Sequence, residues 1–217
     1  MPVEVKFCGL TRAEDAALGA ALGASYLGVV FADSPRRVDA AGARAIFTGV
    51  PHGPRRVGVF GALPAAEIAR TAADAGLDVV QLHGDPNAED VRTLRSHFDG
   101  EIWGACRVAG GDLPEDLASL AEAADRLLLD SRAGKGKVLG GTGTSFDWSA
   151  VARALSRLGF DLRIVVAGGL TPANVGRAIE ALTPSVVDVS SGVEESPGIK
   201  SEELMRAFIE AVGASTK

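Results

Sequence analysis

The sequence predicts an α/β protein, a single-domain (βα)8 TIM barrel with a parallel eight-stranded core over residues 1–217. Two observations predict this fold. Short β-branched or apolar runs alternate with helix-length segments rich in Ala, Leu, Glu and Arg, and no Ser/Pro-rich linker interrupts them. The 217 residues, of which 47% are hydrophobic, suffice for one well-buried core and offer little for a second.

Eight strands are expected, most of them apolar on both faces as a buried parallel sheet requires. They cover 3–8, 26–31, 56–60, 79–82, 102–108, 126–130, 163–167 and 186–189. The helices that follow them cover 13–22, 39–48, 64–75, 87–98, 113–123, 148–158, 172–182 and 202–212. An open doubly wound sheet usually has five or six strands and a Gly-rich turn after the first, so eight βα units favour the closed barrel.

Several helix ends carry their own signals. Thr11 and Glu14 have the spacing of a capping box, and Pro172 stands where a helix is expected to begin. Gly23 and Gly76 are expected to end the first and third helices. These local preferences agree with the periodicity.

Composition excludes several classes of function. The net charge is -6, and no Lys/Arg stripe interleaved with aromatic residues indicates a nucleic-acid binder. Cys8 and Cys106 are too few for a disulfide framework and lack zinc-site spacing, which is typical of a reducing compartment. No signal peptide and no apolar stretch of roughly 20 residues is found. We therefore expect a cytoplasmic protein without membrane contact, whose partners are small molecules or other subunits.

Catalytic residues of such barrels lie at the carboxyl ends of the strands. Cys8 ends the first strand, on the face opposite Val5 and Phe7, and Asp130 ends the sixth strand after three leucines. A lone cysteine there is often only a small buried hydrophobe, and an aspartate can simply cap a turn. From position alone, both residues are candidates.

The segment that follows Asp130 is also a candidate. Residues 131–145 contain five glycines, which would permit a mobile lid or a close approach of backbone to a ligand. Surface disorder is the alternative interpretation.

Two later loops predict a phosphate site. Gly168 and Gly169 follow the seventh strand, and Ser191 and Gly192 follow the eighth. In this fold these loops, with the N-terminus of a short extra helix, commonly bind a phosphate through backbone N–H groups.

Three further polar residues lie at the same end of the barrel. Arg36 and Arg37 follow the second strand, and a guanidinium there could hold a carboxylate bidentately. His83 ends the fourth strand as a ligand, a proton-transfer group or a polar cap. The three histidines form no ligand pair on one element, so no metal is expected.

With these residues in place, the sequence resembles the phosphoribosylanthranilate isomerase family along nearly its whole length. The matching motifs are Lys6-Phe7-Cys8-Gly9, Ser34-Pro35-Arg36-Arg37-Val38, Val80-Gln81-Leu82-His83-Gly84, Leu128-Leu129-Asp130, Gly141-Thr142-Gly143 running to Phe146-Asp147-Trp148, Gly168-Gly169-Leu170 with Asn174-Val175, and Asp188-Val189-Ser190-Ser191-Gly192-Val193-Glu194. Their order and spacing together are highly specific. Phe7 and the stretch 135–139 depart from the family pattern and leave Cys8 and Asp130 untouched.

The resemblance implies an isomerase of tryptophan biosynthesis that works without a metal or cofactor. It implies the Amadori rearrangement of N-(5-phosphoribosyl)anthranilate, with Asp130 as general acid and Cys8 as general base. Arg37, chosen over Arg36 by counting from Phe31, would hold the anthranilate carboxylate. His83 and the backbone of Gly168, Gly169, Ser191 and Gly192 would complete the substrate site.

The acid–base roles carry a hypothesis about protonation. A free Asp titrates at about 3.9 and a free Cys at about 8.5, whereas the reaction needs a protonated acid and a thiolate. We expect the barrel mouth or the bound substrate to perturb both groups.

Three rival readings remain. The related histidine-pathway sugar isomerase normally uses two aspartates and shows internal repetition, and a ribulose-phosphate 3-epimerase needs His and Asp metal ligands. A non-catalytic barrel that binds a sugar phosphate is the third, and retention of Cys8 and Asp130 argues against it. Whether the protein is a monomer or a homodimer is left open.

Overall fold

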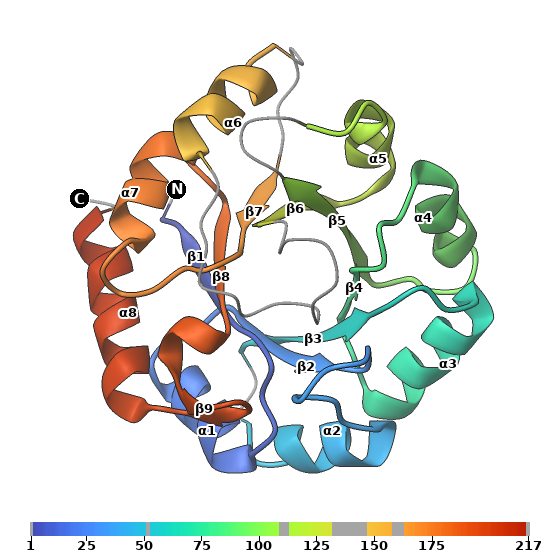
Figure 1. Ribbon diagram of the computed structural model, residues 1–217. Coiled ribbons are helices and arrows are strands. Elements are labelled where there is room, and N and C mark those ends of the chain that lie inside the picture. The colour runs from blue at the N-terminus through green and yellow to red at the C-terminus, as the bar shows by residue number, and fades with distance from the viewer. Residues whose placement is uncertain (1, 51–52, 109–112, 132–146, 158–162, 216–217) are drawn as a thin grey trace.

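The computed structural model describes residues 2–50, 53–108, 113–131, 147–157 and 163–215. Eight parallel strands close into a barrel in sequential order, with β1 pairing both β2 and β8. Eight helices surround it (Figure 1). The predicted (βα)8 barrel is confirmed.

The strands agree with the prediction to within one residue at each end. They are β1 Glu4–Phe7, β2 Tyr26–Val30, β3 Arg55–Phe60, β4 Val79–Leu82, β5 Glu101–Val108, β6 Arg126–Ser131, β7 Ile164–Val166 and β8 Val186–Val189. The helices are α1 Ala13–Ala21, α2 Ala40–Phe47, α3 Ala65–Ala75, α4 Ala88–Arg95, α5 Leu117–Ala123, α6 Trp148–Leu155, α7 Val175–Leu182 and α8 Glu202–Ser215. A short 3-10 helix, η1 Ser191–Val193, and a hairpin of β9 Glu194–Ser196 and β10 Ile199–Lys200 follow β8.

Two of the four predicted helix-end signals are confirmed. Gly23 and Gly76 have positive φ values of 83° and 65°, which the missing side chain permits, and they follow the ends of α1 and α3. The capping box was wrong, because Arg12 is the N-cap of α1 and makes no side-chain cap bond. The Thr11 hydroxyl donates instead to the Gly198 carbonyl, 2.6 Å away in the β9–β10 hairpin.

The predicted start of α7 at Pro172 was also wrong. The helix begins at Val175, and Pro172 lies in the preceding turn. The Asn174 side chain holds that turn, because its Oδ1 accepts from the Thr171 N–H at 2.7 Å and its Nδ2 donates to the Gly169 carbonyl at 2.9 Å. The sequence after β7 is thus used to fix a loop before the helix can start.

Apolar packing has an outer and an inner part. The outer core lies between strands and helices and includes Phe7, which packs against Phe208 at a ring separation of 6.4 Å. The inner cluster fills the barrel and includes Tyr26 and Trp103, whose rings meet edge to face at 4.9 Å. These side chains fill the barrel interior, so the catalytic site of this fold is expected at the mouth of the barrel.

Candidate active site

One cavity opens at the carboxyl ends of the strands. It takes lining residues from β1, β2, β3, β4, β6, β7 and β8 or from the loops after them. Its polar and glycine lining residues include Cys8, Arg36, Gln81, His83, Asp130, Gly168, Gly169, Asp188, Ser191 and Gly192. Of the site residues predicted from sequence, all but Arg37 meet here.

Cys8 reaches the cavity directly after β1. Its N–H donates to the Val189 carbonyl at 2.9 Å, which extends the β1–β8 pairing by one residue and fixes the direction of the thiol. Burial raises the pKa of this thiol, and Lys6 opposes that effect. The cavity without substrate therefore favours the protonated form of Cys8.

Asp130 is one end of a buried chain of polar side chains. Its Oδ2 lies 3.1 Å from His83 Nε2, and His83 Nδ1 lies 3.0 Å from Gln81 Nε2. With the Gln81 amide as donor, His83 is the tautomer that carries its proton on Nε2 and donates to Asp130. His83 thus orients the predicted acid, a contact that the sequence did not reveal.

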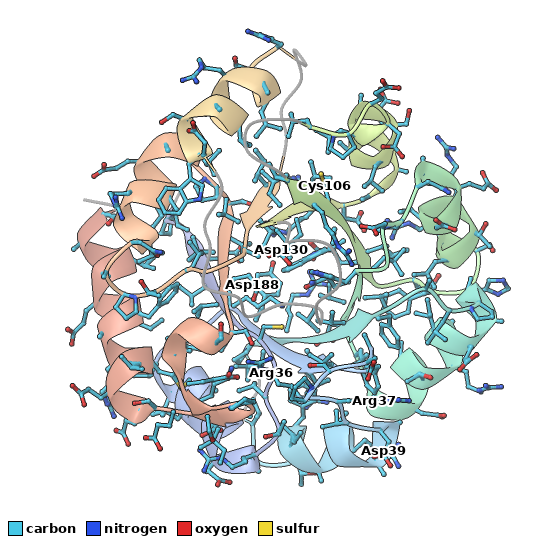
Figure 2. The ribbon with its side chains drawn as sticks, viewed as in Figure 1. Arg36, Arg37, Asp39, Cys106, Asp130 and Asp188 are labelled. Carbon is cyan, nitrogen blue, oxygen red and sulfur yellow. The ribbon has the colours of Figure 1, made fainter. Side chains whose placement is uncertain are left out.

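The two arginines after β2 point to different places. Arg37 pairs its backbone with Val30 and lies in a separate hollow between α2 and α3, beside Asp39 and Glu67. Arg36 lines the cavity. Figure 2 shows Arg36 closer to Asp188 and Asp130 in the barrel centre, with Arg37 further out towards Asp39. Counting from Phe31 had selected Arg37, whereas the fold brings its neighbour Arg36 to the site.

Arg36 is held by Glu194 of the β9–β10 hairpin. Its Nε and Nη2 donate to Glu194 Oε1 and Oε2 at 2.8 and 2.6 Å. Hydrogen bonding to Glu194 raises the pKa of Arg36. These two bonds use two of the five guanidinium N–H groups, so the remaining groups can still receive a ligand carboxylate.

Lys200 ties the same hairpin to β1. Its Nζ donates to Glu194 Oε1 at 2.7 Å and to the Cys8 carbonyl at 2.6 Å. Burial raises the pKa of Glu194, but the bonds from Arg36 and Lys200 outweigh it, so the pKa is lowered. This network was not predicted, because the β9–β10 hairpin that carries Glu194 and Lys200 was itself not predicted from the sequence.

The loops after β7 and β8 contact each other through backbone. Gly168 and Gly169 have φ values of 81° and 67°, which favour glycine. A Cβ at Gly192 would lie 1.8 Å from the Leu170 carbonyl oxygen, so only glycine fits. The predicted short extra helix is η1, which includes Ser191 and Gly192. The four predicted residues therefore share one wall.

Other predictions concern residues that are not described or features that are missing. The predicted lid falls on 131–145, of which 132–145 lie outside the described residues. Across the described part of the chain, no group of three potential metal-binding side chains is found. Within the same ranges, no helix is long and apolar enough to cross a membrane.

A closed parallel barrel with a thiol, a carboxyl group and glycine-rich loops around one mouth cavity defines a (βα)8-barrel enzyme of the acid–base type. A sequence model of the N-(5'-phosphoribosyl)anthranilate (PRA) isomerase family matches residues 5–211, and the chain belongs to that family.

Individual relatives agree with this assignment. An N-(5'-phosphoribosyl)anthranilate isomerase of Rubrobacter xylanophilus is 46% identical over 96% of this chain and 98% of its own length. A structure of generated monomers of dimeric phosphoribosylanthranilate isomerase from Thermotoga maritima has a TM-score of 0.83 and 34% identity, over 98% of this chain and 99% of that chain. A phosphoribosylanthranilate isomerase in complex with reduced 1-(o-carboxyphenylamino)-1-deoxyribulose 5-phosphate has a TM-score of 0.84 and 33% identity, with the same coverage.

Proposed function

We propose that this chain catalyses the Amadori rearrangement of N-(5-phosphoribosyl)anthranilate to 1-(2-carboxyphenylamino)-1-deoxyribulose 5-phosphate, a step of tryptophan biosynthesis. The observation that carries the proposal is the shared cavity of Cys8 and Asp130, in a member of this isomerase family. The reaction needs one group that gives a proton and one that takes a proton, and no redox change from outside.

Asp130 is the proposed general acid. Its proton passes to the furanose ring oxygen, the bond from that oxygen to C1 breaks, and the anilino nitrogen supplies electrons to form an iminium ion. The 3.1 Å contact with His83 keeps the carboxyl group in one orientation and limits how it can turn from the substrate. His83 would also lie close enough to the cavity to contact the sugar.

Cys8 is the proposed general base. Its thiolate takes the C2 proton, the C–H electrons form the C1–C2 double bond, and the iminium nitrogen becomes neutral. The enolamine then loses the proton of the C2 hydroxyl and gains one at C1, which gives the ketone. The iminium cation favours the thiolate just when the base is required, because an opposite charge nearby lowers a thiol pKa.

The remaining side chains would hold the two ends of the substrate. Arg36 is the proposed carboxylate clamp in place of Arg37, because it lines the cavity and Glu194 fixes its guanidinium. The loops with Gly168, Gly169, Ser191 and Gly192 would take the phosphate through their backbone N–H groups.

We propose that each chain carries its own active site, whether the protein is a monomer or a homodimer. Cys8 and Cys106 are free thiols. We propose the cytoplasm as its place of action, because reducing conditions would preserve both thiols.

The test is turnover of substrate generated in the cuvette, followed by loss of its fluorescence with chelator-treated protein. Wild type should be active, and Asp130→Asn should lose about 1,000-fold or more in kcat, since acid–base groups contribute about 10²–10⁴-fold. The Asn variant should still bind the reduced product analogue within a few fold. An inactive wild-type protein that binds the analogue would overturn the proposed activity, and an active Asp130→Asn variant would remove Asp130 from its role.

A further inference from the structure

A buried lysine lies directly below the proposed base. Lys6 precedes Cys8 by two residues, so both side chains point to the inner side of the barrel. Lys6 is 0% exposed, which is rare for a lysine and costly unless its charge is compensated. The mechanism above gives it no role.

Gly28 on β2 provides the space for this arrangement. A Cβ at Gly28 would lie 3.1 Å from Lys6 Cε and 3.3 Å from Cys8 Sγ. The lysine stem and the thiol therefore share the gap that the missing side chain leaves. The positive charge of Lys6 favours the thiolate form of Cys8.

The charge of Lys6 has a second partner, Asp188 on β8. Lys6 Nζ donates to Asp188 Oδ2 at 2.8 Å and lies 5.9 Å from the centre of the Trp103 ring. Asp188 Oδ1 is buried and makes no hydrogen bond among the described residues. The carboxylate thus competes with Cys8 for a single ammonium group in a buried part of the barrel.

We propose that Lys6 is a positioning residue that stabilises the Cys8 thiolate for proton abstraction, and that Asp188 limits how strongly it does so. The inference rests on the proposed function, with Cys8 as base. Lys6 keeps its proton throughout, and the C2 proton goes to Cys8 Sγ. Lys6 acts through Cys8 and not on the substrate.

The charged groups around Cys8 act in opposite directions. Lys6 and Lys200 favour the thiolate, whereas Asp188 disfavours it. Arg36 also interacts electrostatically with Cys8, while His83 and Asp130 line the same cavity. On β2, the residues nearest Cys8 are Gly28 and Val30, which do not titrate.

Lys6 and Asp188 form a buried ion pair. Burial lowers the pKa of Lys6, but Asp188 and Cys8 together outweigh it and raise that pKa, so the ammonium stays charged over the working range. If the Lys6–Asp188 pair had only a structural role, removing either partner would weaken the fold without a consistent effect on the pKa of the Cys8 thiol.

The experiment is the pH dependence of iodoacetamide alkylation at Cys8, in a Cys106→Ser background to remove the other thiol. Lys6→Met should move the alkylation curve to higher pH, with a rate about tenfold or more below the parent at neutral pH. Asp188→Asn should move the curve to lower pH and accelerate alkylation at neutral pH. Lys200→Met is the matched control, because this cation bonds the Cys8 carbonyl, and it should shift the curve less than Lys6→Met.

Opposite shifts for the two partners would support the proposal. Shifts in the same direction, or no shift for Lys6→Met, would overturn it. If Lys6→Met does not fold, Asp188→Asn and Lys6→Arg decide, since a lower-pH curve in the first and a parent-like curve in the second are required. The titration uses no substrate, so its failure is distinct from an inactive wild-type protein, which would instead refute the proposed isomerase activity.

Discussion

Replacing each of two adjacent arginines should separate the substrate clamp from a surface charge. Arg36 lines the cavity and Arg37 lies in a hollow between α2 and α3. We compare Arg36→Met with Arg37→Met, which remove the same charge one residue apart. Only the first should affect catalysis strongly.

The size of the effect follows from the bonds available to Arg36. Two of its N–H groups bond Glu194, and a bidentate carboxylate contact would use two of the remaining three. Hydrogen bonds to charged groups contribute about 1.5–3 kcal/mol each, so losing two at the lower limit costs about 3 kcal/mol. That corresponds to a loss of roughly 100-fold or more in kcat/KM. Arg37→Met should stay within about threefold, as surface substitutions usually do.

The assay is the initial rate of substrate fluorescence loss over a range of concentrations, with thermal unfolding measured alongside. Arg36→Met also leaves Glu194 with Lys200 as its main partner, so Arg36→Lys serves as a check that keeps a cation there. Lysine cannot reproduce the planar bidentate contact, so this variant should remain well below wild type in kcat/KM. An Arg37→Met loss as large as that of Arg36→Met would refute the reasoning.

Three further outcomes are expected. Gly28→Ala should lower kcat and the melting temperature, because the added Cβ would crowd the two side chains beside it, whereas Gly49→Ala, whose Cβ meets nothing within 4 Å, should change neither. His83→Gln should lower kcat by about fivefold with little change in analogue affinity, since one hydrogen bond to Asp130 is worth about 1 kcal/mol. An unchanged kcat would argue against the orienting role. Glu194 has a lowered folded-state pKa, so its stabilising effect is present above its unfolded pKa, near 4.5, and is lost as pH falls through the folded value. Glu194→Gln should therefore flatten the acid limb of unfolding free energy against pH, and an unaltered limb would contradict that sign.

The sequence was sufficient for the barrel and for most of the site wall. Strand periodicity and position at strand ends depend on local pattern, and they located Cys8, His83 and Asp130 correctly in the cavity. The glycine pair 168–169 was readable because its backbone conformation excludes most side chains.

Features that depend on contacts between distant segments could not be predicted from the sequence. The choice between Arg36 and Arg37 is made by Glu194, which is 158 residues away from Arg36 along the chain. Thr11 had the spacing of a helix cap, but its hydroxyl donates to the Gly198 carbonyl in the hairpin instead. In both cases a tertiary partner decided the orientation of a side chain whose local sequence allowed two.

The Lys6–Asp188 pair could be predicted only in part from the sequence. Alternation along the strand placed Lys6 on the inner side with Cys8, but a lysine there has no obvious partner in sequence. Register supplied it, because Lys6 of β1 stands opposite Asp188 of β8.

A crystal structure of this protein with the reduced product analogue would test the proposed active site most directly. We expect Cys8 Sγ near C2 and Asp130 near the oxygen that leaves the ring, each within about 3.5 Å. We also expect Arg36 on the carboxylate and the phosphate between the loops after β7 and β8. An analogue whose carboxylate meets Arg37, or whose C2 lies out of reach of Cys8, would contradict it.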